Sequence, residues 1–306
     1  WSSDVCSSDL LILITLNSLA LWVISLSVSY ALPPSVVVSS KPFHSLVAGV
    51  MSGIAEPKLI VDGLYSPHNY TLKPKNAVEI QSADLIFWGG REIEPFLIRS
   101  LQNLSKTTTI SISELDNLEK LPLRNIKQHQ HHTESGIDPH LWLDPINAIH
   151  IIKGTVTELS SIDPDNSSLY QRNGKDIIVK LELLHTQLTG MSEEIRDIPF
   201  MVYHDSYQYF EHRYQLKSLG VMVQNINHAS SAGRLALIRK QLVKNKVRCL
   251  FSEPQFSDRL VKVATDGITT QIGSLDPIGA RLIPGPELYF NLMDNLINNL
   301  SSCLKK

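Results

Sequence analysis

Short apolar runs alternate with amphipathic segments along the chain after Leu32, and this pattern is typical of α/β folds. The expected strands are 58–65, 84–90, 107–113, 200–204, 220–225, 247–254 and the first part of 270–279. The expected helices are 45–53, 76–83, 92–104, 146–162, 233–245, 258–268 and 286–304. Because helices between successive strands favour parallel pairing, we predict an α/β fold of two Rossmann-like lobes, each with a parallel sheet.

One segment departs from this alternation. From Asp163 to Ile195 the apolar residues recur every three or four positions, at 177, 181, 184, 188, 191 and 195, which predicts one face of a helix. A helix of about 30 residues would be ~45 Å long. We therefore predict a single rigid linking helix within 163–196, between an N-terminal lobe at 32–162 and a C-terminal lobe at 197–306. Ligands of such sheets bind beyond the carboxyl ends of the strands, here in the cleft between the lobes.

The first 31 residues are excluded from the fold. The opening "WSSDVCSSDL" lacks an initiating Met and nearly repeats itself, so we treat it as incomplete or foreign sequence. Residues 10–28 are almost wholly apolar and uncharged, and Ser29 and Ala31 fit a signal-peptidase site that would leave Leu32 as the mature start. A retained membrane anchor is the alternative. We expect export, with 1–31 removed.

Composition limits the possible functions and partners. The 306 residues are 43% hydrophobic and carry a formal net charge of −2, so no strong basic field exists to attract nucleic acid. Cys6 lies in the excluded segment, which leaves Cys249 and Cys303. In an exported chain an even pair favours a disulfide; two buried free thiols are the alternative.

Four polar side chains are predicted at strand-to-loop positions that would line the cleft: His68, His140, His204 and Asp276. From 68 to 140 and from 204 to 276 the spacing is equal, which is either chance or the mark of duplicated lobes that supply ligands from equivalent loops. Three imidazoles and a carboxylate suit tetrahedral Zn²⁺. Four protein ligands leave no position for an activated water, so the set indicates capture of the ion and not hydrolysis.

The other histidines have different interpretations. A polar run holds His129, His131 and His132, which predicts an accessory metal site or a merely solvated loop. We expect Asp144 and Asp205 to be helix caps or turn residues. The remaining histidines are interpreted as structural: His44, His150, His185, His212 and His228.

Five short motifs carry a resemblance to a known family. In order they are "SPHNYTLKP", "DPHLWLDP", "YHDSYQYFE", "SEPQF" and "LDPIG", and they resemble motifs of the periplasmic zinc-binding proteins of ABC transporters, the metal-binding cluster A-I or cluster 9 family. The resemblance extends from Lys41 to the C-terminus. It implies two lobes joined by a rigid helix, Zn²⁺ as the bound ion, and delivery to a membrane permease. The ligand motifs match the three cleft histidines, and the carboxylate motif matches Asp276.

Details of the resemblance refine these expectations. Manganese-binding relatives generally carry Glu where this chain has His204, which favours zinc, and the zinc branch pairs cysteines that match Cys249 and Cys303. The long His-rich loop of many members is reduced to "HQHHTES". Some members offer a Glu just before the first His; Pro67 stands there, so the fourth ligand is Asp276 or a water.

The function we expect is that of a monomeric, non-enzymatic periplasmic carrier of a Gram-negative bacterium. The alternatives are a carrier of manganese or another divalent ion, a zinc hydrolase with Glu211 or Glu253 as base, and an adhesin or lipoprotein of the same fold. A lipoprotein would need a Cys after the leader, and "SYALPP" offers none.

Overall fold

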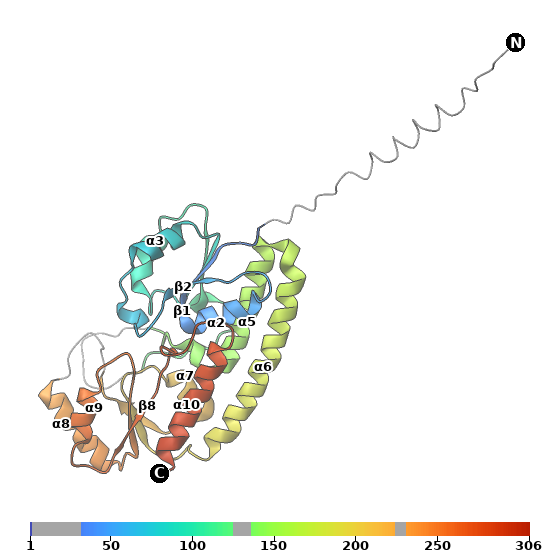
Figure 1. Cartoon of the computed structure of the whole chain (residues 1–306). Helices are drawn as coiled ribbons and strands as arrows, with labels where there is room; N and C mark the ends of the chain where they lie inside the picture. The colour runs from blue at the N-terminus through green and yellow to red at the C-terminus, as the bar shows by residue number, and fades with distance from the viewer. Residues whose placement is uncertain (2–31, 125–135, 224–230) are drawn as a thin grey trace. The chain divides into compact units, whose positions relative to one another are not determined.

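The computed structural model describes residue 1, residues 32–124, 136–223 and 231–306. The chain divides into two units, Trp1–Leu32 and Pro33–Lys306. All the strands described here belong to the second unit (Figure 1). Among the described residues, no helix is long and apolar enough to cross a membrane. The predicted leader at 10–28 lies outside them.

The first sheet contains four parallel strands in the order β2-β1-β3-β4. Their bounds are β1 Val36–Ser40, β2 Lys58–Val61, β3 Leu85–Trp88 and β4 Thr108–Ser111. The helices of this half are α2 Lys41–Val50, α3 Pro74–Gln81 and α4 Ile98–Leu101. The prediction omits β1, because its Val-rich run follows the apolar leader and two prolines without an amphipathic segment to separate them.

The second sheet repeats this arrangement in the order β6-β5-β7-β8, again with parallel pairing. Its strands are β5 Phe200–Val202, β6 Ser218–Val221, β7 Cys249–Ser252 and β8 Gln271–Ser274. The helices that follow these strands directly are α7 Gln208–Tyr214, α8 Ala232–Lys244 and α9 Arg259–Thr265. The prediction of two parallel sheets is confirmed, and α7 is the helix that it misses. At seven residues α7 is too short to show a helical period.

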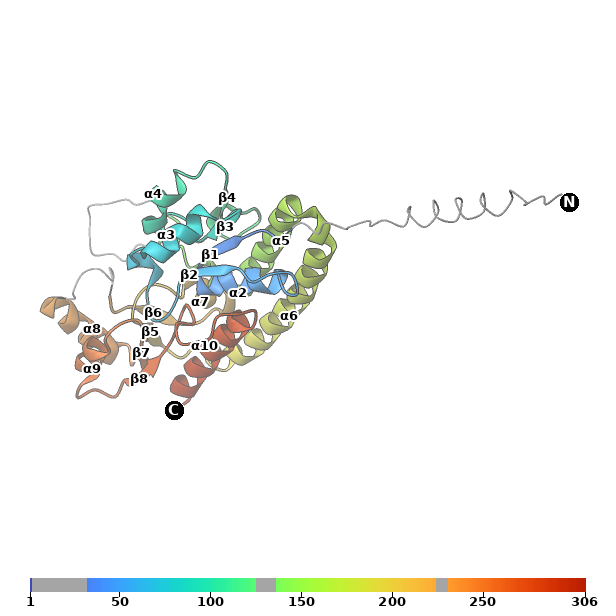
Figure 2. The same cartoon turned by 45° about the horizontal axis from the view of Figure 1, so that its top comes forward.

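A layer of helices is shared by the two halves. It contains α5 Pro145–Ile162, α6 Ser167–Glu193 and α10 Leu288–Leu304, and α2 packs against it. The predicted long helix is present as α6, whose 27 residues span roughly 40 Å. Figures 1 and 2 show α6 running beside α5 and α10. The last helix, α10, contacts α6, α2 and β8, so it joins both halves.

The period-two alternation of the strands distributes their side chains between separate cores. Val36 and Val38 of β1 and Phe200 and Val202 of β5 enter one continuous apolar cluster that includes residues of α2, α5, α6 and α10. The residues between them point the other way: Val37 packs toward α3 and Met201 packs toward α8 and α9. Each sheet is therefore covered on both faces, as parallel sheets generally are.

Candidate metal centre

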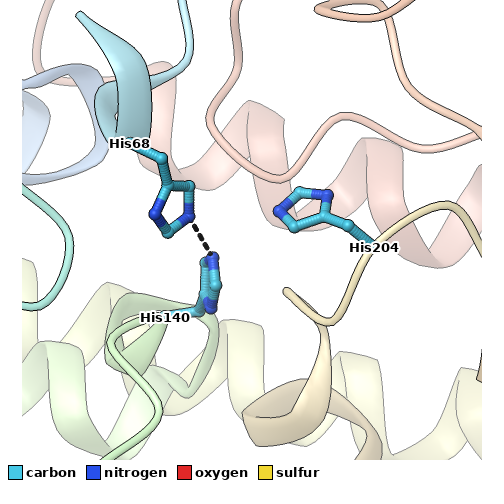
Figure 3. A group of neighbouring side chains, drawn as sticks. All are labelled: His68, His140 and His204. Atoms are coloured by element: carbon cyan, nitrogen blue, oxygen red, sulfur yellow. Dashed lines mark hydrogen bonds between the residues drawn. The ribbon is translucent and has the colours of Figure 1, made fainter. Parts of the chain in front are cut away.

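Three imidazoles from distant parts of the chain meet in one place, as Figure 3 shows. A ring nitrogen of His68, His140 and His204 lies within 4.8 Å of the corresponding atoms of the other two. His68 Nε2 and His140 Nε2 are 3.1 Å apart. Two nitrogens bound to one tetrahedral zinc ion would be ~3.3–3.4 Å apart, given Zn–N bonds of ~2.0–2.1 Å. The spacing therefore fits ligands of a shared metal ion.

Sheet topology explains how His204 reaches this position. It follows β5 directly, and β5 pairs with β6 on one side and β7 on the other, so the chain order reverses there. Such a reversal opens a crevice at the carboxyl ends of the strands. His68 reaches the site from a short 3₁₀ turn, Pro67–Asn69, that begins after β2.

One expectation about these loops is wrong, and one of the two explanations of the equal spacing is ruled out. His140 does not follow a strand: it comes after a single antiparallel bridge between Pro122 and Ile137 and directly before a 3₁₀ turn at Leu141–Leu143. The loops are also not equivalent, because His68 follows the second strand of its sheet and His204 the first strand of its own. The equal spacing in sequence therefore has no counterpart in the topology.

A buried carboxylate orients His140. Asp138 Oδ1 accepts a hydrogen bond from the His140 backbone N–H at 2.9 Å and lies 2.8 Å from Nδ1 of the same ring. When Asp138 is ionised its carboxylate only accepts, so Nδ1 then carries the proton and Nε2 presents its lone pair to the site. Burial raises the pKa of Asp138 to about 7, although the His140 backbone N–H and Arg124 act in the opposite direction.

A second buried carboxylate orients His204. Glu253 follows β7, the neighbour of β5, and its Oε1 lies 2.7 Å from His204 Nδ1. Its side chain is 1% exposed. Carboxylate partners of this kind fix the tautomer of a metal-binding histidine and strengthen it as a ligand. Sequence reasoning missed this role for both acids, although Asp138 lies two residues before a predicted ligand and Glu253 just past a strand.

The three imidazoles differ in proton affinity. Burial lowers the pKa of His68 well below its usual value, and the neighbouring histidines lower it further. Burial and then His204 have the same effect on the pKa of His140. Burial also acts to lower the pKa of His204, but the charge and hydrogen bond of Glu253 outweigh it, and the net result is a raised pKa. His68 and His140 are therefore neutral at neutral pH, as metal ligation requires.

The space between the three rings is very small. The cavity has a volume of about 10 Å³ and is also lined by Trp142 and Phe256. This is enough for one ion or one water, but not for an organic substrate. A larger cavity of about 630 Å³ lies beside α2 and residues 284–286, and none of the three clustered histidines lines it.

Asp276 does not join the three histidines. It follows β8 as predicted, but its Oδ1 accepts hydrogen bonds from Gln255 Nε2 at 2.8 Å and from Ile278 N at 3.3 Å. Gln255 itself lines the small cavity. Asp276 is thus one hydrogen-bonded residue removed from the site, and its role as fourth ligand stays a prediction.

The other residues predicted from sequence fall as follows. Asp144 caps α5 by accepting from Ile146 N, as expected. Asp205 pairs with Arg124 at 3.4 Å. His44 contacts the Pro57 carbonyl, away from the three ligands. The accessory candidates lie outside the described residues, as does one histidine interpreted as structural: His129, His131, His132 and His228.

The predicted disulfide is present. Cys249 at the start of β7 is bonded to Cys303 near the end of α10, with 6.3 Å between their Cα atoms. The bridge therefore ties the shared helical layer to the second sheet.

The model of one protein family matches residues 36–303, nearly all of the unit that carries the site. That family is ZnuA, the periplasmic component A of zinc-uptake complexes. The chain belongs to the ZnuA family. The resemblance drawn from the five motifs is therefore confirmed.

Curated ZnuA proteins align with most of the chain. The high-affinity zinc uptake system protein ZnuA of Brucella suis is 35% identical, and the alignment covers 89% of this chain and 92% of that protein. The ZnuA protein of Yersinia pestis is 28% identical over 89% and 91% of the two chains.

Solved structures share the fold. A crystal structure of ZnuA superimposes with a TM-score of 0.77 at 20% identity and covers 89% of this chain and 99% of the other. A Mn-bound periplasmic metal-binding protein from Candidatus Liberibacter asiaticus gives a TM-score of 0.74 at 22% identity, covering 88% and 99%. The two-lobed ZnuA architecture therefore accommodates sequences as different as these.

Proposed function

We propose that this protein captures Zn²⁺ in the periplasm and delivers it to the membrane permease of an ABC transporter. The observation that carries the proposal is the convergence of three imidazoles, two of them oriented by buried carboxylates, in a chain of the ZnuA family. The zinc-uptake names of the curated relatives support the same cargo.

The donor chemistry favours zinc. Imidazole nitrogens suit late first-row metals, whereas manganese prefers carboxylate and water oxygens. With three nitrogen ligands, the fourth position would be filled by Asp276, once its carboxylate leaves Gln255, or by a water. Relatives of similar fold are described as bound to manganese or cadmium, so those ions are the natural competitors in any binding assay.

The geometry of the site does not favour a hydrolase. A zinc hydrolase needs room for a substrate beside the metal-bound water and a free general base. The cavity holds about 10 Å³, and the two acids that contact the histidines, Asp138 and Glu253, are engaged with His140 and His204. Capture followed by release fits this geometry better than catalysis does.

The test is a zinc titration of metal-free protein, by competition with a chromophoric chelator. His140→Ala removes one donor and should weaken binding by more than the roughly 10–100-fold loss that follows removal of an outer-shell partner. His150→Ala is the matched control, because His150 lies on α5 outside the group of three ligands. Weak and equal affinity in the wild type and His140→Ala would refute zinc capture. Tighter binding of manganese than of zinc would reassign the cargo.

A further inference from the structure

Two short segments beside the metal centre run antiparallel and form what we call the stem, residues 121–123 and 136–138. Asp138 N donates to the Leu121 carbonyl at 2.8 Å, and Leu123 N donates to the Gly136 carbonyl at 3.0 Å. Pro122 and Ile137 form the bridge between them. The stem ends two residues before His140, so its position fixes where that ligand begins.

A tyrosine from the other half of the chain connects the two segments. The Tyr209 hydroxyl accepts a hydrogen bond from Leu121 N at 3.0 Å and donates one to the Asp138 carbonyl at 2.9 Å. Its side chain is 1% exposed. Beside it, Gln208 Nε2 donates to the Pro122 carbonyl at 3.1 Å. The start of α7 therefore holds the stem through three hydrogen bonds.

These contacts continue to the metal ligand without a break. Tyr209 bonds the backbone of Asp138, and the carboxylate of Asp138 bonds both the backbone and the ring of His140. Tyr209 itself follows His204 by five residues. One short segment thus carries one ligand and holds the residue that orients another.

Charged contacts attach α7 to the same region independently of the tyrosine hydroxyl. Arg213 near the end of α7 donates to both carboxylate oxygens of Asp144, at 2.9 and 2.6 Å. Arg124, next to the stem, pairs with Glu211 of α7. Removal of one hydroxyl should therefore leave α7 docked and change only how the stem is aligned.

We infer that Tyr209 is a positioning residue for the metal centre: its hydroxyl sets the stem so that Asp138 holds the His140 Nε2 atom where it can share a metal ion with His68 and His204. This inference rests on the proposed zinc capture. It assigns a role to a residue outside the group of ligands and their carboxylate partners. The ring of Tyr209 fills core space, whereas the hydroxyl provides the alignment.

The experiment compares Tyr209→Phe with Tyr170→Phe. Tyr170 is a matched control, since it is also fully buried and donates its hydroxyl to Asp163, away from the three histidines. We expect Tyr209→Phe to weaken zinc binding about 3–10-fold, less than the ~10–100-fold loss typical of a direct outer-shell partner. The visible absorption spectrum of the Co²⁺-loaded protein should also change, because it reports ligand geometry. Tyr170→Phe should leave both readouts at the wild-type values.

A double-mutant cycle separates positioning from a general loss of stability. In a His140→Ala background, Tyr209→Phe should have no further effect on zinc affinity, because the residue acts through His140. A full effect in that background would overturn the inference. So would wild-type affinity and an unchanged cobalt spectrum in the single variant.

Two further outcomes are also decisive. If Tyr209→Phe does not fold, Gln208→Ala replaces it, with an expected loss of about 2–3-fold in zinc affinity, and no loss would refute the positioning role. If the wild-type protein itself binds zinc weakly, the proposed function fails first. Tight zinc binding by the wild type, with affinity and cobalt spectrum both unchanged in Tyr209→Phe, refutes the positioning role alone.

Discussion

Removal of the Cys249–Cys303 disulfide should lower stability strongly while leaving the metal centre unchanged. The bridge joins residues that are 54 apart in sequence. The loop-entropy relation gives about 14 cal/mol/K for a loop of that length, or about 4 kcal/mol at 25 °C. The double variant Cys249→Ala/Cys303→Ala should lose about this much free energy of unfolding. With an m-value of about 3 kcal/mol/M, the urea midpoint would fall by more than ~1 M.

Zinc affinity should not follow stability in this variant. Cys249 lies at the amino end of β7, and Glu253 follows the carboxyl end of the same strand. The four residue steps from Cys249 to Glu253 correspond to roughly 13 Å of extended chain. The urea midpoint and the zinc dissociation constant of the double variant are compared with those of the oxidised wild type. Reduced wild-type protein serves as a second control. A midpoint within ~0.3 M urea of the oxidised wild type would refute the entropy argument, and a tenfold loss of zinc affinity would refute the separation of bridge and site.

Two further predictions concern buried acids. Burial raises the pKa of Glu94 to about 7 from 4.5, although the nearby polar groups of Ser39, Gly89 and Ser40 act to lower it. The folded state therefore binds this proton more tightly than the unfolded state does. The contribution of Glu94 to the free energy of unfolding, about 3 kcal/mol, is fully present below pH 4.5 and is lost as the pH rises to 7. In urea unfolding of the metal-free proteins, the stability of Glu94→Gln relative to the wild type should therefore increase from pH 4.5 to pH 7. Parallel plots of unfolding free energy against pH would contradict this. Glu253→Gln should weaken zinc binding about 10–100-fold at neutral pH. It should also lower the pH at which zinc affinity is lost on acidification, because Glu253 makes the largest contribution to the raised pKa of His204. Zinc competition titrations at a series of pH values provide the measurement, and Glu287→Gln, at an exposed position, is the control. The prediction is contradicted if the midpoint pH of the affinity loss stays the same or rises.

The parts of the fold that follow from periodicity were predictable. Alternating apolar runs indicate both parallel sheets, and the spacing from Ile177 to Ile195 indicates α6. Short elements escape this reasoning. Tyr209 and its neighbours form a seven-residue helix whose aromatic residues are buried by contacts with residues far away in sequence. Such an element is stabilised by tertiary packing, which a single sequence does not display.

The convergence of the three histidines was predictable from sequence, whereas the residues that orient them were not. His68, His140 and His204 share a residue type and a position near the ends of elements, so they could be selected together. The partners Asp138 and Glu253 depend on which strands are neighbours and on how a turn folds back. The hydrogen bond between Asp276 and Gln255 is equally invisible in sequence. A carboxylate next to a site and a carboxylate ligating the ion have the same sequence pattern.

The contact between α2 and α10 has a consequence for how the chain matures. Ser45 of α2 accepts a hydrogen bond from Tyr289 N and donates one to the Pro286 carbonyl, so an early helix is bound to the last helix, α10, and to the segment just before it. The N-terminal half of the chain is made first, and the apolar residues of α2 that pack against α10 stay exposed until α10 has also been made. During that interval the new chain avoids aggregation and proteolysis only if chaperones bind it or if its completion and folding are fast.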